Sequence, residues 1–235
     1  MPERIDVQLF KLRRRMIKMC SLVDEQVESA LKAVTTEDHE LAEEVISLDL
    51  KVDSYDLKIS KACQKIFALN HPLAADLRFL MSALTINNNL ERIGDIAVNI
   101  CENFLLKGKK PSFFERIKFL DMARIVREMI QNSIDSFIRL DLPLAKKVIV
   151  ADKALDRINV ENHRLIIDIM KEERDSIDEA VAYMVMCRQL ERIGDHATNI
   201  AEDVYFIVEA RTVRHNYSEF FEGDSSTGPG FTEEG

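Results

Sequence analysis

The stretch LERIGDIAVNICE at residues 90–102 recurs almost unchanged as LERIGDHATNIAE at 190–202. Upstream of these stretches, acidic and apolar positions also recur 103 residues apart, as at Asp38 and Asp141 or at Leu41 and Leu144. The offset falls to 100 residues in the turn that precedes each LERIGD stretch. Self-similarity at a long, fixed period is the signature of a repeated structural unit. The chain is therefore predicted to consist of two copies of one unit.

Each copy is predicted to contain three helices. From Ile5 onward, apolar residues recur at alternating spacings of four and three, which is typical of helices in a bundle. Cap-type residues mark the starts: Asp38, Asp141, Ser112 with Glu115, and Ser176 with Glu179. The expected helices cover about 5–34, 38–69 and 73–106 in the first copy, then 112–140, 141–173 and 176–213. This pattern predicts an all-α protein of two tandem three-helix, up-down-up bundles.

The run from Lys107 to Pro111 interrupts the apolar pattern and marks the expected boundary between the copies. The first domain is predicted to cover residues 1–108 and the second 109–213. Beyond these, residues 214–235 are polar, rich in Gly and Ser, and without periodicity. Such a composition predicts a disordered C-terminal tail.

The overall composition excludes several functions. A formal net charge of −9 argues against nucleic acid as the main partner, since phosphate backbones require a basic face. The four cysteines lie far apart without a CxxC pair, which indicates thiols in the core and a reducing cytoplasm. No apolar run could span a bilayer, so membrane contact is expected only through partners. The basic run from Lys11 to Lys18 is interpreted as a solvated helix face rather than as a contact with an anionic membrane or partner.

Acidic residues spaced four apart are the strongest functional signal. They lie on two adjacent predicted helices of each copy, as Asp49 with Asp53, Glu91 with Asp95, Asp152 with Asp156, and Glu191 with Asp195. Residues four apart share one helix face. The midpoints between the facing motifs fall at about residue 72 and between 173 and 174, in the predicted turns. The four acids of each copy are therefore expected to face one another at one level.

Converging carboxylates need a cation. A pair of unit charges at 4 Å repels by about 1 kcal/mol in water and about 4 kcal/mol at an effective dielectric of 20. Arg92 and Arg192 are expected to occupy the next face of their helices. Hard or borderline metal ions accept several carboxylate oxygens and can be bridged in clusters. The sequence therefore predicts one multinuclear metal centre per copy, against the alternative of a solvated acidic face.

The neighbouring residues leave several roles open. Gly94 and Gly194 are costly in mid-helix, so either close packing or room for an ion is expected there. Outer metal contacts are possible for Asn99, Asn199, Glu102 and Glu202. His196 has Ile96 as its counterpart, which excludes a role shared by both copies.

The sequence favours a regulator over an enzyme. Metal-dependent all-α phosphohydrolases are the main rivals, but they use ExxE and ExxD spacings, whereas three residues separate the acids of every pair here. A ferritin-like di-iron oxidase would need ExxH pairs, which do not occur at these sites. No nucleophile with a paired base stands out either. A metal-free helical adaptor is the third possibility.

The run HPLAADLRFLMSAL at 71–84, the doubled LERIGD with its trailing Asn, and the tandem acidic pairs together resemble the PhoU family. The E(D)xxxD motif of that family maps onto the eight acidic residues named above. The resemblance implies multinuclear metal clusters, with iron expected first and manganese, magnesium or zinc as alternatives. It also implies homodimers and a cytoplasmic role in restraining phosphate uptake. The implied partners are the ATPase subunit of the phosphate ABC transporter and a phosphate-sensing histidine kinase.

The second copy departs from this pattern at one turn, where KEERDSID at 171–178 replaces HPLAADLR. A partner contact at that turn would therefore belong to the first copy only.

Overall fold

The computed structural model describes residues 4–213, and within them it contains helices and no strands. The first repeat comprises α1 (Ile5–Thr36), α2 (His39–Asn70) and α3 (Ala74–Lys107). The second comprises α4 (Phe119–Arg139), α5 (Leu142–Glu172) and α6 (Ile177–Glu209), with the short 3-10 turns η1 (Phe114–Arg116) and η2 (Arg174–Ser176). The predicted all-α fold of two tandem three-helix units is confirmed. The predicted tail at 214–235 lies outside the described residues.

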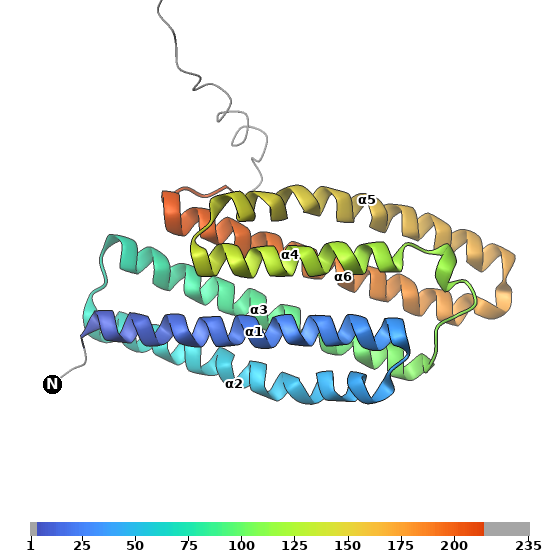
Figure 1. The fold of residues 1–235 in the computed structure, drawn as a ribbon, viewed down its shortest axis with the longest axis horizontal. Coiled ribbons are helices and arrows are strands. Elements are labelled where there is room, and N and C mark those ends of the chain that lie inside the picture. Colours follow the sequence, from blue (N-terminus) through green and yellow to red (C-terminus); the bar gives the residue numbers. More distant parts are fainter. Residues whose placement is uncertain (1–3, 214–235) are drawn as a thin grey trace, which may run out of the picture.

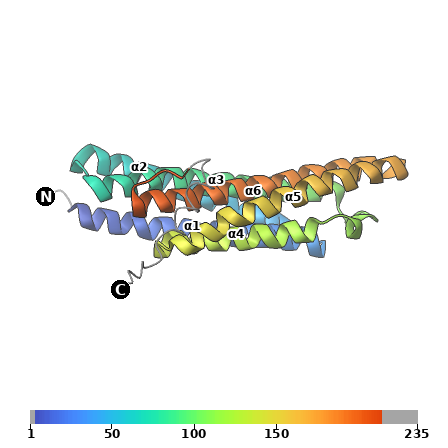
Figure 2. The same cartoon turned by 90° about the horizontal axis from the view of Figure 1, so that it is seen from above.

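The six helices run along one long axis, and the second repeat is displaced along that axis relative to the first (Figure 1). Viewed from above, the helices form two layers (Figure 2). The larger layer has the order α2, α3, α6, α5, and the smaller layer contains α1 and α4. All eight candidate metal-binding acids therefore lie on helices of the larger layer.

The two repeats share one apolar core. Contacts between α3 and α6 make most of the interface between the repeats, and α1 adds a smaller contact with α4. Buried side chains of all six helices form one continuous cluster. The four cysteine thiols are free and buried in it, as the sequence indicated. Within residues 4–213, no helix has the length and apolar character needed to cross a membrane.

The predicted turns of both hairpins are confirmed. α2 ends at Asn70 and α3 begins at Ala74, while α5 ends at Glu172 and α6 begins after η2. The carboxylates of Asp38 and Asp141 each accept a hydrogen bond at 3.0 Å from the backbone N–H three residues on, so both act as N-caps. The box expected at Ser176 does not form: the Ser176 hydroxyl donates to Glu173 instead.

The predicted start of the fourth helix is wrong. α4 begins at Phe119, seven residues after Ser112, and Ser112 makes no capping box. Phe113 and Phe114 are buried instead, with ring centroids 6.1 and 5.6 Å from that of Tyr183 on α6. Both rings pack against Tyr183, and a short 3-10 turn stands where the first turn of the expected helix would be. The domain boundary expected between 108 and 109 falls just ahead of this segment and stays a prediction.

Both mid-helix glycines lie where helices pack closely. A Cβ atom at Gly94 would lie 2.8 Å from Gln26 Oε1 and 3.3 Å from Val52 Cγ1. At Gly194, a Cβ atom would lie 2.4 Å from Leu155 Cδ2. Close helix packing therefore accounts for both glycines without reserved space for an ion.

Replacing Gly194 with Ala should lower the free energy of unfolding by about 1 kcal/mol, because overpacking costs about 1–3 kcal/mol and the helix preference of Ala returns about 1 kcal/mol. Leu155 is fully buried and cannot turn outward. Urea denaturation measures the change. In a Leu155→Val background, which removes the clashing atom, the cost should shrink or reverse. An equal cost in both backgrounds would contradict the packing explanation.

Candidate metal centres

In the first repeat, α2 and α3 bring Asp49, Asp53, Glu91 and Asp95 together. Burial is the main cause of the raised pKa of Asp49, and the charges of Asp53 and Asp95 add to it. The pKa of Glu91 is raised by burial and then by Asp95, with a further contribution from Asp53. Acids from both helices thus act on one another, in agreement with the facing arrangement expected from the hairpin midpoint.

Two groups offset part of this repulsion. Gln26 of α1 donates from Nε2 to Asp49 Oδ1 at 3.0 Å, which lowers the pKa of Asp49 against the effect of burial. Arg92 lies 3.4 Å from Glu91 and 3.1 Å from Asp95. Arg92 was expected on the next face of the helix, and its long side chain bends back from there over the acids. Half of its side chain is still exposed, so these ion pairs are weak.

In the second repeat, α5 and α6 bring Asp152, Asp156, Glu191 and Asp195 together. Burial raises the pKa of Asp152 to about 6, and the charges of Asp156 and Asp195 contribute to the shift. The pKa values of Glu191 and Asp195 are raised by burial first and then by neighbouring acids of this group. The second acidic group is thus also crowded and partly desolvated.

The compensating groups differ between the repeats. The position of Gln26 is taken in the second repeat by Met129, a buried side chain without a donor. Arg188, one turn before Glu191 on α6, donates a hydrogen bond to Glu191 Oε1. The hydroxyl of Thr198 lowers the pKa of Asp152 in place of the amide, but burial and the neighbouring acids outweigh it.

The carboxylate oxygens are suitable donors for a hard metal ion, although their side chains do not converge on one coordination site. Within residues 4–213, no three His, Cys, Asp or Glu side chains are placed so that they could hold a metal ion. The donors are all carboxylate oxygens, the ligands that hard cations prefer. Glu91 Oε2, Asp152 Oδ1 and Glu191 Oε2 are buried and accept no hydrogen bond. Glu91 Oε2 has an ion pair with Arg92 at 3.4 Å, whereas Asp152 Oδ1 and Glu191 Oε2 have no such contact and would gain most from a cation, because a buried acceptor without a partner is costly.

Sequence reasoning missed several polar neighbours of the first group. Asp56 lies three residues beyond Asp53, and its charge adds to the raised pKa of Glu91. Its carboxylate accepts a hydrogen bond of 2.5 Å from Asn87 Nδ2 of α3. A signal for Gln26 was present, because it is a polar residue in the apolar stripe that runs from Val23 to Val27.

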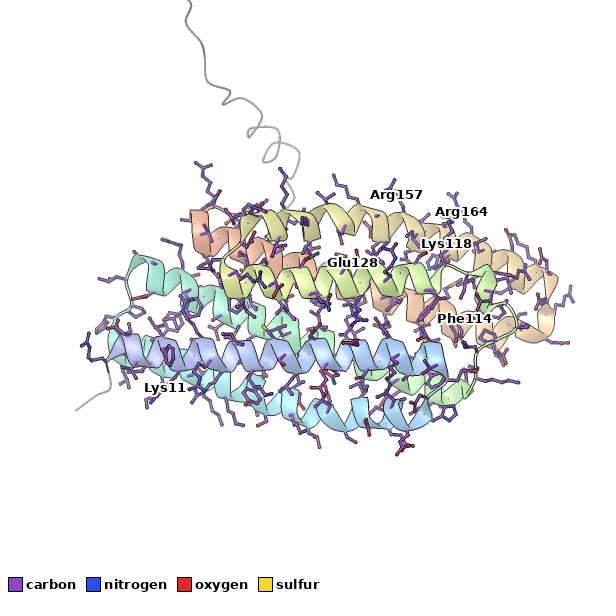
Figure 3. All side chains as sticks on the ribbon, viewed as in Figure 1. Lys11, Phe114, Lys118, Glu128, Arg157 and Arg164 are labelled. Atoms are coloured by element: carbon purple, nitrogen blue, oxygen red, sulfur yellow. The ribbon has the colours of Figure 1, made fainter. Side chains whose placement is uncertain are left out.

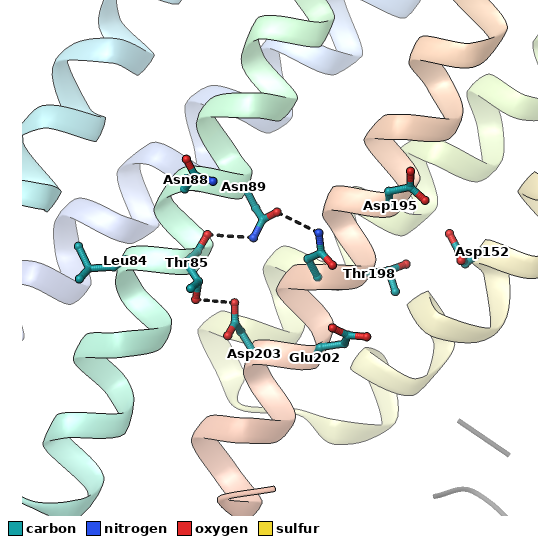
Figure 4. A pocket seen from close by; sticks show the side chains of 10 residues that line it. Leu84, Thr85, Asn88, Asn89, Asp152, Asp195, Thr198, Glu202 and Asp203 are labelled. Atoms are coloured by element: carbon teal, nitrogen blue, oxygen red, sulfur yellow. Dashed lines mark hydrogen bonds between the residues drawn. The ribbon is translucent and has the colours of Figure 1, made fainter. Parts of the chain in front are cut away.

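A polar pocket of about 770 Å³ joins the second acidic group to the first repeat. Asp152, Asp195 and Glu202 line it from α5 and α6, and α3 supplies its other wall (Figure 4). Glu202, whose role the sequence left open, is only 8 % exposed, whereas its counterpart Glu102 lies on the surface. The open roles of Asn99 and Asn199 also differ, since Asn99 donates to its own helix at Asp95 O and Asn199 reaches across to α3.

Hydrogen bonds across this pocket connect the repeats. Asn89 Oδ1 of α3 accepts from Asn199 Nδ2 at 3.2 Å and lies 2.9 Å from His196 Nδ1. The Thr85 hydroxyl donates to Asp203 at 2.7 Å (Figure 4). Burial lowers the pKa of His196, which favours the neutral ring. His196 therefore has a contact that Ile96 of the first repeat cannot make, as its lack of a matching counterpart implied.

Metal-free protein should become less stable as pH rises from 5 to 7.5. Folding raises the pKa of Asp152 from 3.8 to about 6, so the folded state binds this proton more tightly than the unfolded state. The stabilisation is complete below pH 4 and is lost as pH rises through about 6. Thermal unfolding of chelator-treated protein should show a higher Tm at pH 5.

Asp152→Asn should raise the Tm at pH 7.5 and flatten the profile, whereas the exposed Asp168→Asn should leave the profile unchanged. A Tm that rises with pH in metal-free protein would contradict this.

Comparison with known proteins agrees with this architecture. The PhoU domain matches residues 16–104 and again 119–204. The phosphate-specific transport system accessory protein PhoU homolog 1 of Thermotoga maritima is 30 % identical over 95 % of this chain and 95 % of its own length. The PhoU homolog of Aquifex aeolicus is 36 % identical over 89 % of this chain and 95 % of its own length.

Solved structures show the same fold. The crystal structure of PhoU from Pseudomonas aeruginosa superposes with a TM-score of 0.84 at 31 % identity and covers 88 % of this chain and 100 % of that one. The phosphate transport system regulatory protein PhoU from Streptococcus pneumoniae gives 0.80 at 25 % identity, over 89 % of this chain and 99 % of that one. Both repeats, their order and nearly their whole length are thus common to these proteins, and the chain belongs to the PhoU family.

Proposed function

We propose that this protein is a metal-binding regulator of phosphate uptake. The observation that carries the metal part is the pair of carboxylate groups, one per repeat, with three buried oxygens that accept no hydrogen bond. The regulatory part rests on family membership, since the similar proteins are accessory proteins of phosphate-specific transport systems. Its role is to restrain the phosphate ABC transporter and phosphate-sensing two-component signalling.

Each repeat would hold its own multinuclear cluster. Asp49, Asp53, Glu91 and Asp95 are the proposed ligands in the first repeat, and Asp152, Asp156, Glu191 and Asp195 in the second. Iron is the first candidate, and manganese, magnesium or zinc are compatible with all-oxygen sites. Bound cations would remove the mutual repulsion of the carboxylates. With this repulsion removed, α2 would be held against α3 and α5 against α6, so that each helix pair presents a defined surface to a partner.

Regulation through contact requires partners. We propose the ATPase subunit of the phosphate ABC transporter and the phosphate-sensing histidine kinase in this role, and a homodimer as the active assembly. The turn from His71 to Leu73 is the candidate contact, because the corresponding turn of the second repeat has a different sequence and a 3-10 segment. Leu73 is 78 % exposed there and so is accessible to a partner.

The enzymatic alternative has less support. A phosphohydrolase would need cations near the acids to receive a phosphorylated substrate. Arg92 and Arg188 are the neighbours, and each is engaged with the acids themselves. A metal-free adaptor is the other alternative, and metal content separates it from the proposal.

Wild-type protein purified without a metal-affinity tag should contain two or more transition-metal ions per chain, as measured by elemental mass spectrometry. Asp53→Asn with Asp156→Asn should lose most of this metal, because each substitution removes a charge from one cluster. A matched control is Glu43→Gln with Asp168→Asn, which removes two exposed charges from the same two helices outside the clusters. Full metal content in the first double variant would refute the ligand assignment, and a folded, metal-free wild type would favour the adaptor.

Deletion of the gene should raise phosphate uptake in phosphate-replete cells, because the restraint on the transporter is lost. Uptake of radiolabelled phosphate measures this. The control double variant should restore the wild-type rate when expressed in the deletion strain, and the Asp53→Asn, Asp156→Asn variant should not. Unchanged uptake in the deletion strain would argue against the regulatory role, whatever the metal content.

A further inference from the structure

A basic hollow of about 720 Å³ lies between α1 and α2, near the N-terminal end of the first repeat. Lys11, Arg14, Arg15 and Lys18 line it from α1, together with Ser21, and Tyr55 lines it from α2. No acidic side chain contributes to its wall. Four cations thus converge on one hollow in a chain whose net charge is −9.

The equivalent position of the second repeat carries an ion pair, in which Lys118 Nζ lies 2.6 Å from Glu161. The corresponding residues of the first repeat, 103 positions earlier, are Arg15 and Lys58. Two positive charges therefore replace one salt bridge. Arg15 donates to the backbone carbonyl of Lys58 at 3.4 Å, and the Lys58 ammonium lies 4.9 Å from the ring centroid of Tyr55. These contacts place Lys58 beside Tyr55 at the edge of the hollow, and they neutralise neither Arg15 nor Lys58.

Three of the four cations of the hollow lack an acidic partner among the described residues. Considering residues 4–213 only, Arg14, Arg15 and Lys18 form no ion pair with any acidic side chain. Like charges that line one hollow repel one another. A solvated helix face would not need them to converge. The hollow therefore has the electrostatics of an anion site.

The hollow also lies partly outside the repeated unit. α1 has 32 residues and α4 has 21, and the first residue of α4, Phe119, corresponds to Met16. The first turns of α1 thus have no helical counterpart, and the match to the PhoU domain begins only at residue 16. Lys11 stands on this extra length, whereas its counterpart Phe114 belongs to η1 (Figure 3). Lys11, Arg14 and Arg15 thus precede the matched domain, and Lys18 lies just inside it.

We propose that this hollow binds an anion carrying phosphoryl groups. Guanidinium groups of Arg14 and Arg15 match phosphoryl oxygens in pairs, ammonium groups add charge, and the side chains of Ser21 and Tyr55 can donate further hydrogen bonds. Ile17, 43 % exposed at the same wall, offers apolar surface to the rest of the ligand. The phosphoryl group belongs either to a soluble phosphate compound or to an anionic lipid head group, and the two sources are separable by experiment.

The test uses the full chain and two probes. Sodium pyrophosphate, titrated by isothermal calorimetry, represents the soluble source. Vesicles of phosphatidylglycerol in phosphatidylcholine, assayed by co-sedimentation, represent the lipid source. The triple variant Arg14→Gln, Arg15→Gln, Lys18→Gln should weaken binding of the effective probe at least about tenfold, since charge-assisted contacts to the phosphoryl group are lost. A matched control, Lys32→Gln, Lys109→Gln, Lys147→Gln, changes net charge equally and should bind as the wild type does.

A second variant tests anion binding at the hollow while the cations of α1 stay in place. Lys58→Glu gives Arg15 the acidic neighbour that Lys118 has in the second repeat, and should weaken binding while the circular dichroism spectrum stays unchanged. The Asp53→Asn, Asp156→Asn variant should bind the probe normally, because the hollow does not depend on the carboxylate groups. Binding of neither probe, equal losses in both triple variants, or binding of poly-glutamate alone would overturn the proposal.

Discussion

The packing of α3 against α6 is the contact on which the rest of the molecule depends. It joins the two repeats into one core and places the other four helices around this pair. α3 carries Glu91 and Asp95, and α6 carries Glu191 and Asp195, so half of each acidic group lies on a helix of the shared interface. Disturbing this contact would therefore disturb both acidic groups together. The same contact forms the polar pocket between the repeats.

The second constraint is the repulsion between the crowded carboxylates, which the two repeats offset with different neighbouring groups. The first uses the Gln26 amide, and the second leaves an oxygen of Asp152 without a hydrogen bond. Asp56 of the first repeat is replaced by the buried Asn159 of the second. Duplicated units that keep the ligand positions but change their surroundings will differ in charge and in solvent access. The two acidic groups would therefore differ in their affinity for the proposed metal ions, although their carboxylates are the same.

The large features of the fold could be read from the sequence because they are periodic. The doubled LERIGD stretch revealed the repeat, and the apolar spacing located the hairpin turns at 71–73 and 173–176. The start of α4 was missed, because burial of Phe113 and Phe114 against Tyr183 overrides the local capping signal. Contacts between side chains of different helices, such as Gln26 with Asp49, produce no repeating pattern in the sequence and so could not be predicted from it. The bending of Arg92 onto the acids was also missed, because spacing gives the helix face but not the rotamer.

The hydrogen bond between Asn89 and His196 has a consequence for the way the repeats respond to cations. Asn89 lies two residues before Glu91, and His196 directly follows Asp195, so one short contact joins the backbone segments that carry both acidic groups. If cations bind at the acidic groups as proposed, a shift of α6 on loading at Asp195 would reach α3 through this contact. Thermodynamic linkage would make such an effect reciprocal, so that occupancy of either repeat would change the cation affinity of the other by the same factor. The duplicated chain would in this respect act as two coupled sites, with a response to cation concentration unlike that of two isolated bundles.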